Sequence, residues 1–144
     1  MLISEVLLVK GRDVVKVADT DRVRAAVQKL AKHRIGALVV EDQWMQPVGV
    51  FSERDFINAV AARGIAVMDL PVRDLMSAPI ISCKSSDHTD AVLAMMTLAR
   101  IRHVPVIDEK RLSGIVSIGD LVKHRLDEKE LEASVLLDIT RMRA

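Results

Sequence analysis

The sequence predicts an α/β fold in which two β-α-β-β-α repeats pack about a pseudo-twofold axis. The first observation is a motif, Gly-apolar-apolar-Ser-x-x-Asp, that is written twice, as GVFSERD at 49–55 and GIVSIGD at 114–120. The second is that the segments before the motifs also align, residues 14–35 over 80–101. A fixed offset of this kind indicates an internal duplication.

The third observation is that the two copies differ in length by one residue, and the difference falls in a turn. Residues 43–48 in the first copy stand against 109–113 in the second, so the offset changes from 66 to 65 there. Turns tolerate insertions and deletions better than strands and helices do. The gap therefore supports the duplication.

Each copy is expected to open with a short apolar strand, residues 14–17 or 80–83, followed by a helix that starts near Asp21 or Asp87. Spacing of i, i+4, i+7 and i+8 is typical of one buried helix face. The residues expected on the buried faces of these helices are Val23, Val27, Leu30 and Ala31 in the first copy and Val92, Met95, Met96 and Ala99 in the second.

Two strands and a second helix complete each copy. The strands are ALVV (37–40) with VGVF (48–51), and VPVI (104–107) with SGIVS (113–117). They are apolar throughout, which is typical of strands buried on both faces. The second helix starts near Ser52 or Ser117 and carries Ile57, Val60 and Ala61 in the first copy, with Gly64 as its C-cap, and Leu121 and Val122 in the second.

The predicted boundaries are 1–66 for the first repeat with its N-terminal segment, 67–127 for the second repeat with the linker, and 128–144 for a C-terminal helix. Residues 72–76 in the linker are expected to form a short helical turn. The apolar face of the C-terminal helix either caps the module, which is the simpler interpretation, or joins a partner chain.

Composition argues against several classes of function. The net charge is +1, from 21 basic and 20 acidic residues, so neither nucleic acid nor a membrane is expected as a partner. Cys83 is the single cysteine, which excludes an intramolecular disulfide and a thiolate zinc site. The four histidines lack metal-ligand spacing, and no catalytic constellation stands out. We expect a cytoplasmic protein with no metal and no enzymatic activity.

The repeated Ser-x-x-Asp has two interpretations. In the first, Ser52 and Ser117 cap helices while Asp55 and Asp120 reach back to the cap, which is a capping box. In the second, the free N–H groups of the helix start hold a phosphate, and the carboxylate accepts hydrogen bonds from a ribose. The second interpretation implies a nucleotide.

The motifs resemble those of CBS domains, which occur in pairs. The stretches that carry the resemblance are RIGALVVED (34–42), RIRHVPVID (100–108), VRDLMSAPIISC (72–83) and the two Ser-x-x-Asp motifs, and the resemblance covers residues 5–126. It implies a stand-alone tandem CBS pair (a Bateman module) that forms a homodimer and regulates an unidentified protein.

The resemblance also implies an adenosine-type regulatory ligand in the clefts between the repeats, and no catalytic cofactor. AMP is expected first, with ADP, ATP, NAD(H) and S-adenosylmethionine as alternatives. The function implied is a signal-transducing nucleotide sensor. The alternative is a ligand-independent dimerisation or partner-regulating module, in which both motifs act only as helix caps.

Carried over residue by residue, one cleft would use Asp120 for the ribose and Ser117 for a phosphate or ribose oxygen. Its adenine would lie against Lys10, Gly11, Val14 and Val15, with Val40 lining the base slot. The related cleft would use Asp55 and Ser52, with Met76, Pro79 and Ile80 from the segment before the second repeat.

The two clefts are expected to differ in charge. Arg102 and His103 stand where the first copy has Gly36 and Ala37. Because family members often reach phosphates from this position, the Ser117/Asp120 cleft is expected to be the stronger site for a charged nucleotide. Arg54 is an alternative phosphate contact for the Asp55 cleft. A solvated surface role stays equally open for Arg54 and Arg102.

Overall fold

The protein is described by a computed structural model that covers residues 1–143. Its elements, in chain order, are α1 (Ile3–Lys10), β1 (Lys16–Ala18), α2 (Val23–His33), β2 (Ala37–Glu41), β3 (Pro47–Ser52), α3 (Glu53–Arg63), the 3-10 turns η1 (Ile65–Asp69) and η2 (Val72–Asp74), α4 (Thr89–Ala99), β4 (His103–Asp108), β5 (Arg111–Ser117) and α5 (Ile118–Arg143). None of the helices in these residues is both long and apolar enough to span a bilayer.

The first unit contains a three-stranded sheet in the order β1-β2-β3, in which β1 runs parallel to β2 and β3 antiparallel to it. Leu38 and Val40 of β2, Phe51 of β3 and Val23 of α2 are fully buried in one core. The predicted α/β class and the β-α-β-β-α order are confirmed in this unit. Gly64 ends α3 with a φ of 82°, as expected for a C-cap glycine.

The second unit repeats the arrangement with one strand fewer. β4 and β5 pair antiparallel, with His103 opposite Ser117. The strand expected at 80–83 is wrong, because only Cys83 pairs, in a single parallel bridge to Val106. This bridge matches the pairing of Val17 with Val40 in the first unit.

The missing strand has a physical reason on each side of Cys83. Upstream, the backbone of Ser77 is held by the first unit, where it exchanges hydrogen bonds of 2.8 and 3.1 Å with Val50. Downstream, the Lys84 N–H donates to the Asp87 carboxylate and the Ser85 N–H donates to Asp108. These contacts leave one residue in register with β4.

Each unit is completed by the segment that precedes the other unit. Helix α1 buries Ile3, Val6 and Leu7 in the core of the second unit, although the sequence-based boundaries group it with the first. In exchange, the linker buries Val72 in the core of the first unit. The two units are therefore tied together by a reciprocal crossing of the chain, which is consistent with a pseudo-twofold relation.

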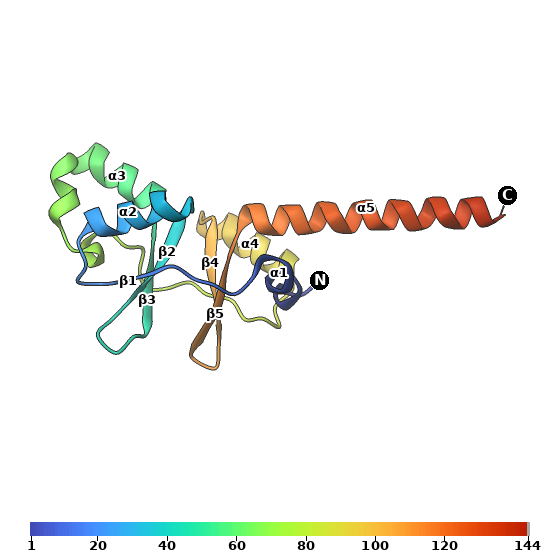
Figure 1. The fold of residues 1–144 in the computed structure, drawn as a ribbon, viewed down its shortest axis with the longest axis horizontal. Coiled ribbons are helices and arrows are strands. Elements are labelled where there is room, and N and C mark those ends of the chain that lie inside the picture. Colours follow the sequence, from blue (N-terminus) through green and yellow to red (C-terminus); the bar gives the residue numbers. More distant parts are fainter. Residues whose placement is uncertain (144) are drawn as a thin grey trace.

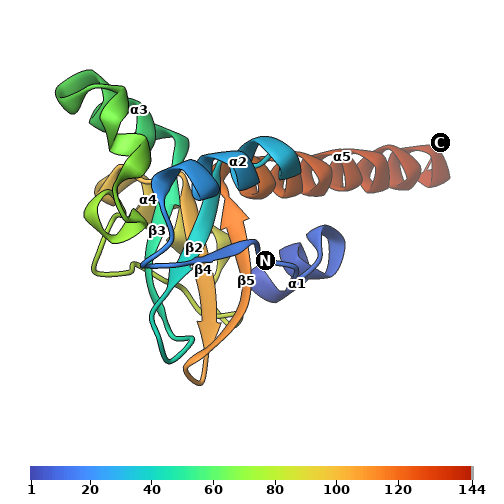
Figure 2. The same ribbon diagram turned by 60° about the vertical axis from the view of Figure 1, so that its left-hand side comes forward.

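The hairpins β2–β3 and β4–β5 lie side by side with their turns at the same edge of the molecule (Figures 1 and 2). The helical faces differ in detail from the expectation. Ala31 and Ala99 are exposed, Ala26 is buried in place of Ala31, and α3 buries none of its residues. The short turn expected at 72–76 is present as η2.

The predicted C-terminal helix is not a separate element. Helix α5 runs without a break from Ile118 through residue 128 to Arg143, and it leaves the body of the molecule (Figure 1). From residue 129 to 143 every side chain is exposed. The expectation that this helix caps the module is wrong, because its last four turns extend beyond the edge of the second unit.

Candidate functional site

Both Ser-x-x-Asp motifs form capping boxes. The Asp55 N–H donates to Ser52 Oγ at 3.2 Å, and Asp55 Oδ2 accepts from the Ser52 N–H at 3.0 Å. In the second motif the Asp120 N–H donates to Ser117 Oγ at 3.1 Å, and Asp120 Oδ2 accepts from the Ser117 N–H at 2.8 Å. The structural role predicted for the motifs is confirmed, and it leaves room for a second role because each carboxylate has another oxygen.

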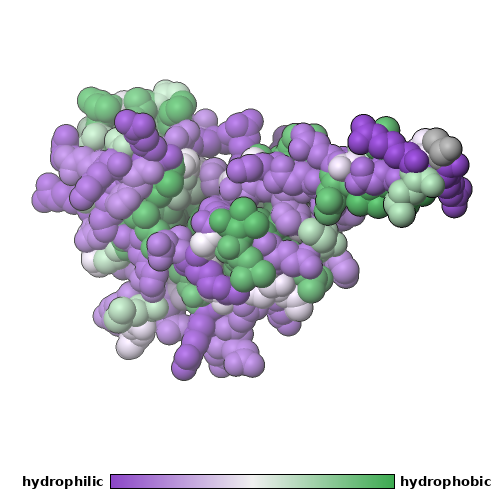
Figure 3. Space-filling model, turned by 45° about the vertical axis from the view of Figure 1, so that its right-hand side comes forward, coloured by the Kyte–Doolittle hydropathy of each residue, from purple (hydrophilic) through white to green (hydrophobic). Residues whose placement is uncertain are grey.

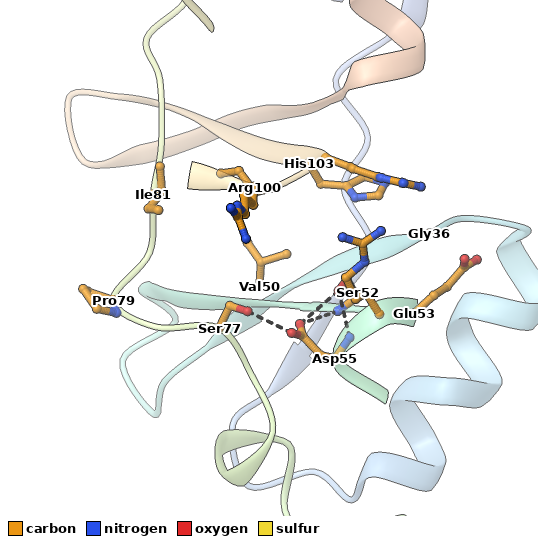
Figure 4. Close-up of a pocket in the computed structure, with 13 residues that line it drawn as sticks. Gly36, Val50, Ser52, Glu53, Asp55, Ser77, Pro79, Ile81, Arg100 and His103 are labelled. Carbon is orange, nitrogen blue, oxygen red and sulfur yellow. Dashed lines mark hydrogen bonds between the residues drawn. The ribbon is translucent and has the colours of Figure 1, made fainter. Parts of the chain in front are cut away.

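A pocket lies against the first motif, between the two units (Figure 4). Its empty volume of about 840 Å³ includes space that is open to solvent. We call it the Asp55 pocket. Its lining residues are Gly36, Val50, Ser52, Glu53, Arg54, Asp55, Ser77, Pro79, Ile81, Arg100, Ile101, Arg102 and His103.

The polar floor of the Asp55 pocket is a short hydrogen-bonded chain. Ser77 Oγ donates to Asp55 Oδ1 at 2.9 Å, while Ser52 Oγ lies 3.1 Å from Asp55 Oδ2. Figure 4 shows Ser77 and Ser52 on opposite sides of the Asp55 carboxylate. The carboxylate is thus fixed in position at the start of α3, and a ligand hydroxyl that displaced Ser77 would find Oδ1 ready to accept its hydrogen bond.

Three arginines outnumber the two carboxylates, Glu53 and Asp55, that line the Asp55 pocket, so its charge is positive. Arg54 comes from the first motif, and Arg100 and Arg102 come from the second unit, just before β4. Within residues 1–143 none of these guanidinium groups forms an ion pair. Figure 4 shows Arg100 pointing from the second unit towards Val50 of the first. Unpaired guanidinium groups beside a helix N-terminus favour an anionic group such as a phosphate.

The prediction that assigned Arg102 and His103 to the Ser117/Asp120 cleft is corrected here, because both line the Asp55 pocket. The basic residues on which the expected ranking of the clefts rested therefore lie at the other cleft. The reason is the packing of the units: the start of β4 lies against the start of β2, and a Cβ added to Gly36 would lie 3.1 Å from the His103 ring. Arg54 lines the same pocket, as its alternative assignment expected.

His103 lies between the two clefts. Burial lowers the pKa of its imidazole, the positive charges of Lys10 and Arg102 lower it further, and the nearby carboxylates of Glu53 and Asp120 oppose this. Lys10 and Asp120 belong to one cleft, whereas Glu53 and Arg102 belong to the other. The protonation of His103 is therefore coupled to the charged groups of both clefts.

The Ser117/Asp120 cleft is differently charged. Its empty volume is about 550 Å³, again partly open, and it is lined by Val6, Val9, Lys10, Asp120, Lys123, His124 and Asp127. Lys10 Nζ donates to Asp120 Oδ2 at 2.5 Å, which confirms that the segment before the first repeat reaches Asp120. Two lysines face two carboxylates here, so the cleft carries no excess of positive charge.

The structure places the other predicted site residues as follows. Pro79 lines the Asp55 pocket, whereas Ile80 does not and its neighbour Ile81 takes that place. Met76 packs under Gly49, against the core of the first unit. Val40 is fully buried in the same core, which includes residues of α2, and it lines neither cleft.

Gly11, Val14 and Val15 connect α1 to β1 and line neither of the two clefts. Gly11 is exposed with a φ of 98°, which ends α1, and Val15 packs against the core of the first unit. The connection lies between Lys10, at the Asp120 cleft, and β1. The adenine contacts expected from these residues therefore stay predictions.

Sequence reasoning missed several lining residues of the Asp55 pocket, chiefly Arg100, Ser77 and Ile81. Ser77 and Ile81 flank the predicted Pro79, so the linker was the correct segment and the direction of each side chain was the missing information. Arg100 has a left-handed φ of 55° at the end of α4. Arg34, its counterpart in the repeat, has the same geometry but lines neither cleft. Among residues 1–143 no three His, Cys, Asp or Glu side chains are close enough to hold a metal ion.

Comparison with known proteins decides the family. The CBS domain family matches residues 4–62 and again residues 72–127. The chain belongs to the CBS domain family. The two matches fall on the two units of the structure, so the chain contains a tandem CBS pair.

Relatives of known structure agree with this assignment. A CBS-domain containing protein from Agrobacterium tumefaciens is 41% identical, with a TM-score of 0.83 over 86% of this chain and 92% of that one. A CBS domain protein from Pyrobaculum aerophilum, solved in complex with AMP, is 32% identical, with a TM-score of 0.78 over 92% of this chain and 99% of that one.

Among curated proteins, the mitochondrial CBS domain-containing protein CBSX3 from Arabidopsis thaliana is 33% identical over 146 residues, which is 92% of this chain and 71% of that protein. The chain spans about three fifths of the length of other curated relatives that it matches.

Proposed function

We propose that this CBS pair is a regulatory module that binds a phosphate-bearing adenosine ligand in the Asp55 pocket. The observation that carries the proposal is that one fixed carboxylate, Asp55, lines the same pocket between the two units as three unpaired guanidinium groups. A carboxylate suits the two hydroxyls of a ribose. Guanidinium groups suit phosphate oxygens. The pocket therefore offers both contacts that a nucleotide needs.

The roles follow from the positions of the side chains. Asp55 accepts from the ribose hydroxyls, and Ser52 with the N-terminus of α3 lies beside the phosphate. Arg54, Arg100 and Arg102 neutralise the phosphate charge. The apolar side chains of Val50, Ile81 and Ile101 line the same pocket and offer a surface for the base.

Charge selects among the ligands that the family resemblance suggests. S-adenosylmethionine has no phosphate and carries a net positive charge, which a pocket of net positive charge disfavours. AMP, ADP, ATP and NAD(H) all bring phosphate. AMP is the leading candidate, supported by the AMP complex of the Pyrobaculum aerophilum relative.

A ligand in this pocket contacts both units at once, which gives a route to regulation. Asp55 and Arg54 belong to the first unit, and Arg100 and Arg102 belong to the second. Binding therefore favours the arrangement of the units in which these groups converge. A ligand changes such an equilibrium only through its unequal affinity for the two arrangements. The protein that responds to the change is unidentified.

The experiment is thermal unfolding of the wild type, Asp55→Asn and Asp120→Asn, with AMP, ADP, ATP, NAD(H), S-adenosylmethionine or adenosine at millimolar concentration. A ligand at 100 times its Kd stabilises by about 2.7 kcal/mol, or roughly 5–10 °C for a chain of this size. We expect a shift that is lost in Asp55→Asn and kept in Asp120→Asn. If the shift in melting temperature is lost only in Asp120→Asn, the ligand binds in the Ser117/Asp120 cleft instead.

The second candidate is the ligand-independent module for dimerisation or partner regulation. The observation in its favour is that both motifs already act as complete helix caps without a ligand. If none of the six compounds raises the melting temperature of the wild type, the Asp55 pocket is not a nucleotide site and this candidate takes its place.

A further inference from the structure

The protruding half of α5 carries an apolar stripe that nothing in the described chain covers. Leu131, Val135, Ile139 and Met142 are spaced i, i+4, i+8 and i+11, and they lie 66%, 48%, 42% and 85% exposed. That spacing places all four on one face of the helix. Figure 3 shows apolar side chains along the underside of this helix, beyond the body of the molecule.

The stripe continues a face of α5 that is buried where the helix passes over its own domain. Leu121 lies 1% exposed in the core of the second unit. Ile139 follows Leu121 by 18 residues, which is about five full turns at roughly 3.6 residues per turn. The same face of the helix thus packs on a core at its start and meets solvent at its end. Exposed apolar surface of this kind marks an interaction site.

The charges along the helix indicate which partner fits. Its middle is acidic, with Asp127, Glu128, Glu130 and Glu132 around a single lysine, and its end carries Arg141 and Arg143 after one acid, Asp138. Two such helices side by side in parallel would set acid against acid and arginine against arginine. In the antiparallel orientation the arginines of each helix would lie beside the acidic segment of the other, which is attractive.

We propose that α5 pairs antiparallel with α5 of a second copy of this chain through the stripe Leu131, Val135, Ile139 and Met142. Val135 lies at the twofold axis, and Leu131 of each copy lies opposite Ile139 of the other. In this register Arg143 is level with Asp127 of the other copy. Arg141 is level with Lys129, between Glu128 and Glu130, and Asp138 is level with Glu132.

The length of the free segment agrees with this register. Residues 129–143 extend past the second unit, a length of about 23 Å at roughly 1.5 Å per residue. Centred on Val135, the partner helix spans that segment and ends where the domain begins, so the two domains lie at opposite ends of a two-helix rod. The proposal is independent of any ligand in the Asp55 pocket.

The first test is sedimentation equilibrium of the full chain as wild type, Val135→Glu and Leu137→Glu. Leu137 is a matched control because it is 58% exposed on the same helix but points about 200° away from Val135. We expect a wild-type dimer whose Kd rises about 30-fold or more in Val135→Glu. Leu137→Glu is expected to keep the wild-type Kd. Neither position contacts a core, so both variants are expected to keep the wild-type melting behaviour when monomeric.

The second test decides the orientation. In Arg141→Ala/Arg143→Ala the antiparallel dimer loses attraction, so its Kd rises and the dependence on salt weakens. A parallel dimer would lose repulsion instead, and its Kd would fall.

Four results overturn the proposal. The first is a wild type that stays monomeric, and the second is a dimer that Val135→Glu leaves intact because it forms through the helices of the domain. The third is a rise in the dimer Kd in Leu137→Glu equal to that in Val135→Glu. The fourth is a tighter dimer in the double arginine variant.

Discussion

Lys10 donates a hydrogen bond from its Nζ to Asp120 Oδ2 at 2.5 Å, although 110 positions separate the two residues. The same Nζ donates to the Ile115 carbonyl at 2.7 Å. Lys10 is the last residue of α1, and Asp120 is in the first turn of α5. The contact thus fixes the end of the exchanged N-terminal helix to the motif of the second unit.

The first prediction concerns this pair. Burial alone would raise the pKa of Asp120, but the hydrogen bonds from Lys10 and from the Ser117 N–H, with the charge of Lys10, outweigh it and hold the pKa below the ordinary value of 3.8. Lys10→Met is expected to lower the free energy of unfolding by about 1 kcal/mol at pH 7, since both side chains are partly exposed. Urea unfolding measures the difference.

The pH dependence of that difference has a defined sign. A carboxylate whose pKa is lowered by folding contributes stability that is present above its unfolded pKa and is lost as the pH falls through the folded one. The difference between the wild type and Lys10→Met should therefore shrink below about pH 4. Lys123→Met is the control, because Lys123 lines the same cleft without a hydrogen bond to Asp120. Equal effects of the two variants would contradict the prediction.

The second prediction concerns the caps. Ser52→Ala and Ser117→Ala each remove an oxygen that accepts a helix N–H, so each is expected to lower the free energy of unfolding by about 1 kcal/mol. Ser52→Thr keeps the hydroxyl and is the control, expected within a few tenths of a kcal/mol of the wild type. Urea unfolding at pH 7 checks all three, and a Thr variant as unstable as the Ala variant would show that the loss has another origin.

The third prediction separates phosphate recognition from nucleoside recognition. Arg100→Ala/Arg102→Ala is expected to raise the Kd for AMP by about tenfold or more, because two unpaired guanidinium groups leave the pocket. The Kd for adenosine should stay unchanged. Calorimetric titration measures both, with Arg111→Ala, an exposed site outside the pocket, as the control. An equal loss for adenosine would mean that these arginines do not act on the phosphate.

The fourth prediction concerns His103. Its pKa in the native protein lies below the ordinary value of 6.5 because of burial and then the charge of Lys10. The unfolded state therefore binds more protons just below pH 6.5, so the stability of the wild type should fall as the pH decreases through this range. His103→Gln should remove that part of the slope, whereas exposed His33→Gln should keep it. Urea unfolding between pH 5 and 7.5 measures the slopes, and a parallel pair of curves for the wild type and His103→Gln would contradict the assignment.

The fifth prediction tests how the linker is held under the Asp55 pocket. A Cβ added to Gly49 would lie 2.8 Å from Met76 Sδ and 2.9 Å from the Ser77 carbonyl oxygen. Gly49→Ala is expected to cost about 1–3 kcal/mol of stability, and to shift Ser77 away from Asp55. Gly119→Ala is the control, because its Cβ would lie 3.6 Å from Ser117 Oγ within a helix, where alanine is favoured. Urea unfolding of both variants decides the point; the prediction fails if the Gly49 variant is as stable as the wild type.

Features that depend on residues close together in the chain could be predicted from the sequence. The capping boxes join Ser52 to Asp55 and Ser117 to Asp120 over three positions, so the motif alone specifies them. The repeat, the strand pairs and the C-cap at Gly64 are of the same kind. The doubled motif, with the strand entries that precede it, is also sufficient to indicate the CBS family.

Features that depend on how the two units meet could not be predicted in this way. The sequence places Arg102 and His103 fifteen and fourteen positions before Ser117, which suggests the wrong cleft, whereas the packing of β4 beside the first unit turns them towards Asp55. The exchange of α1 and the linker between the two cores, and the extension of α5 past the domain, belong to the same class of feature.

The repeated unit, its family and the caps that start its helices thus follow from the amino-acid sequence, because each depends on local spacing and periodicity. Three other features depend on tertiary packing: the unit that each connecting segment completes, the cleft that receives the arginines, and the helix face that stays uncovered. Packing is needed for these because apolar burial is not directional. The apolar residues of α1 could be buried in either core, and only the packed arrangement of both units selects one.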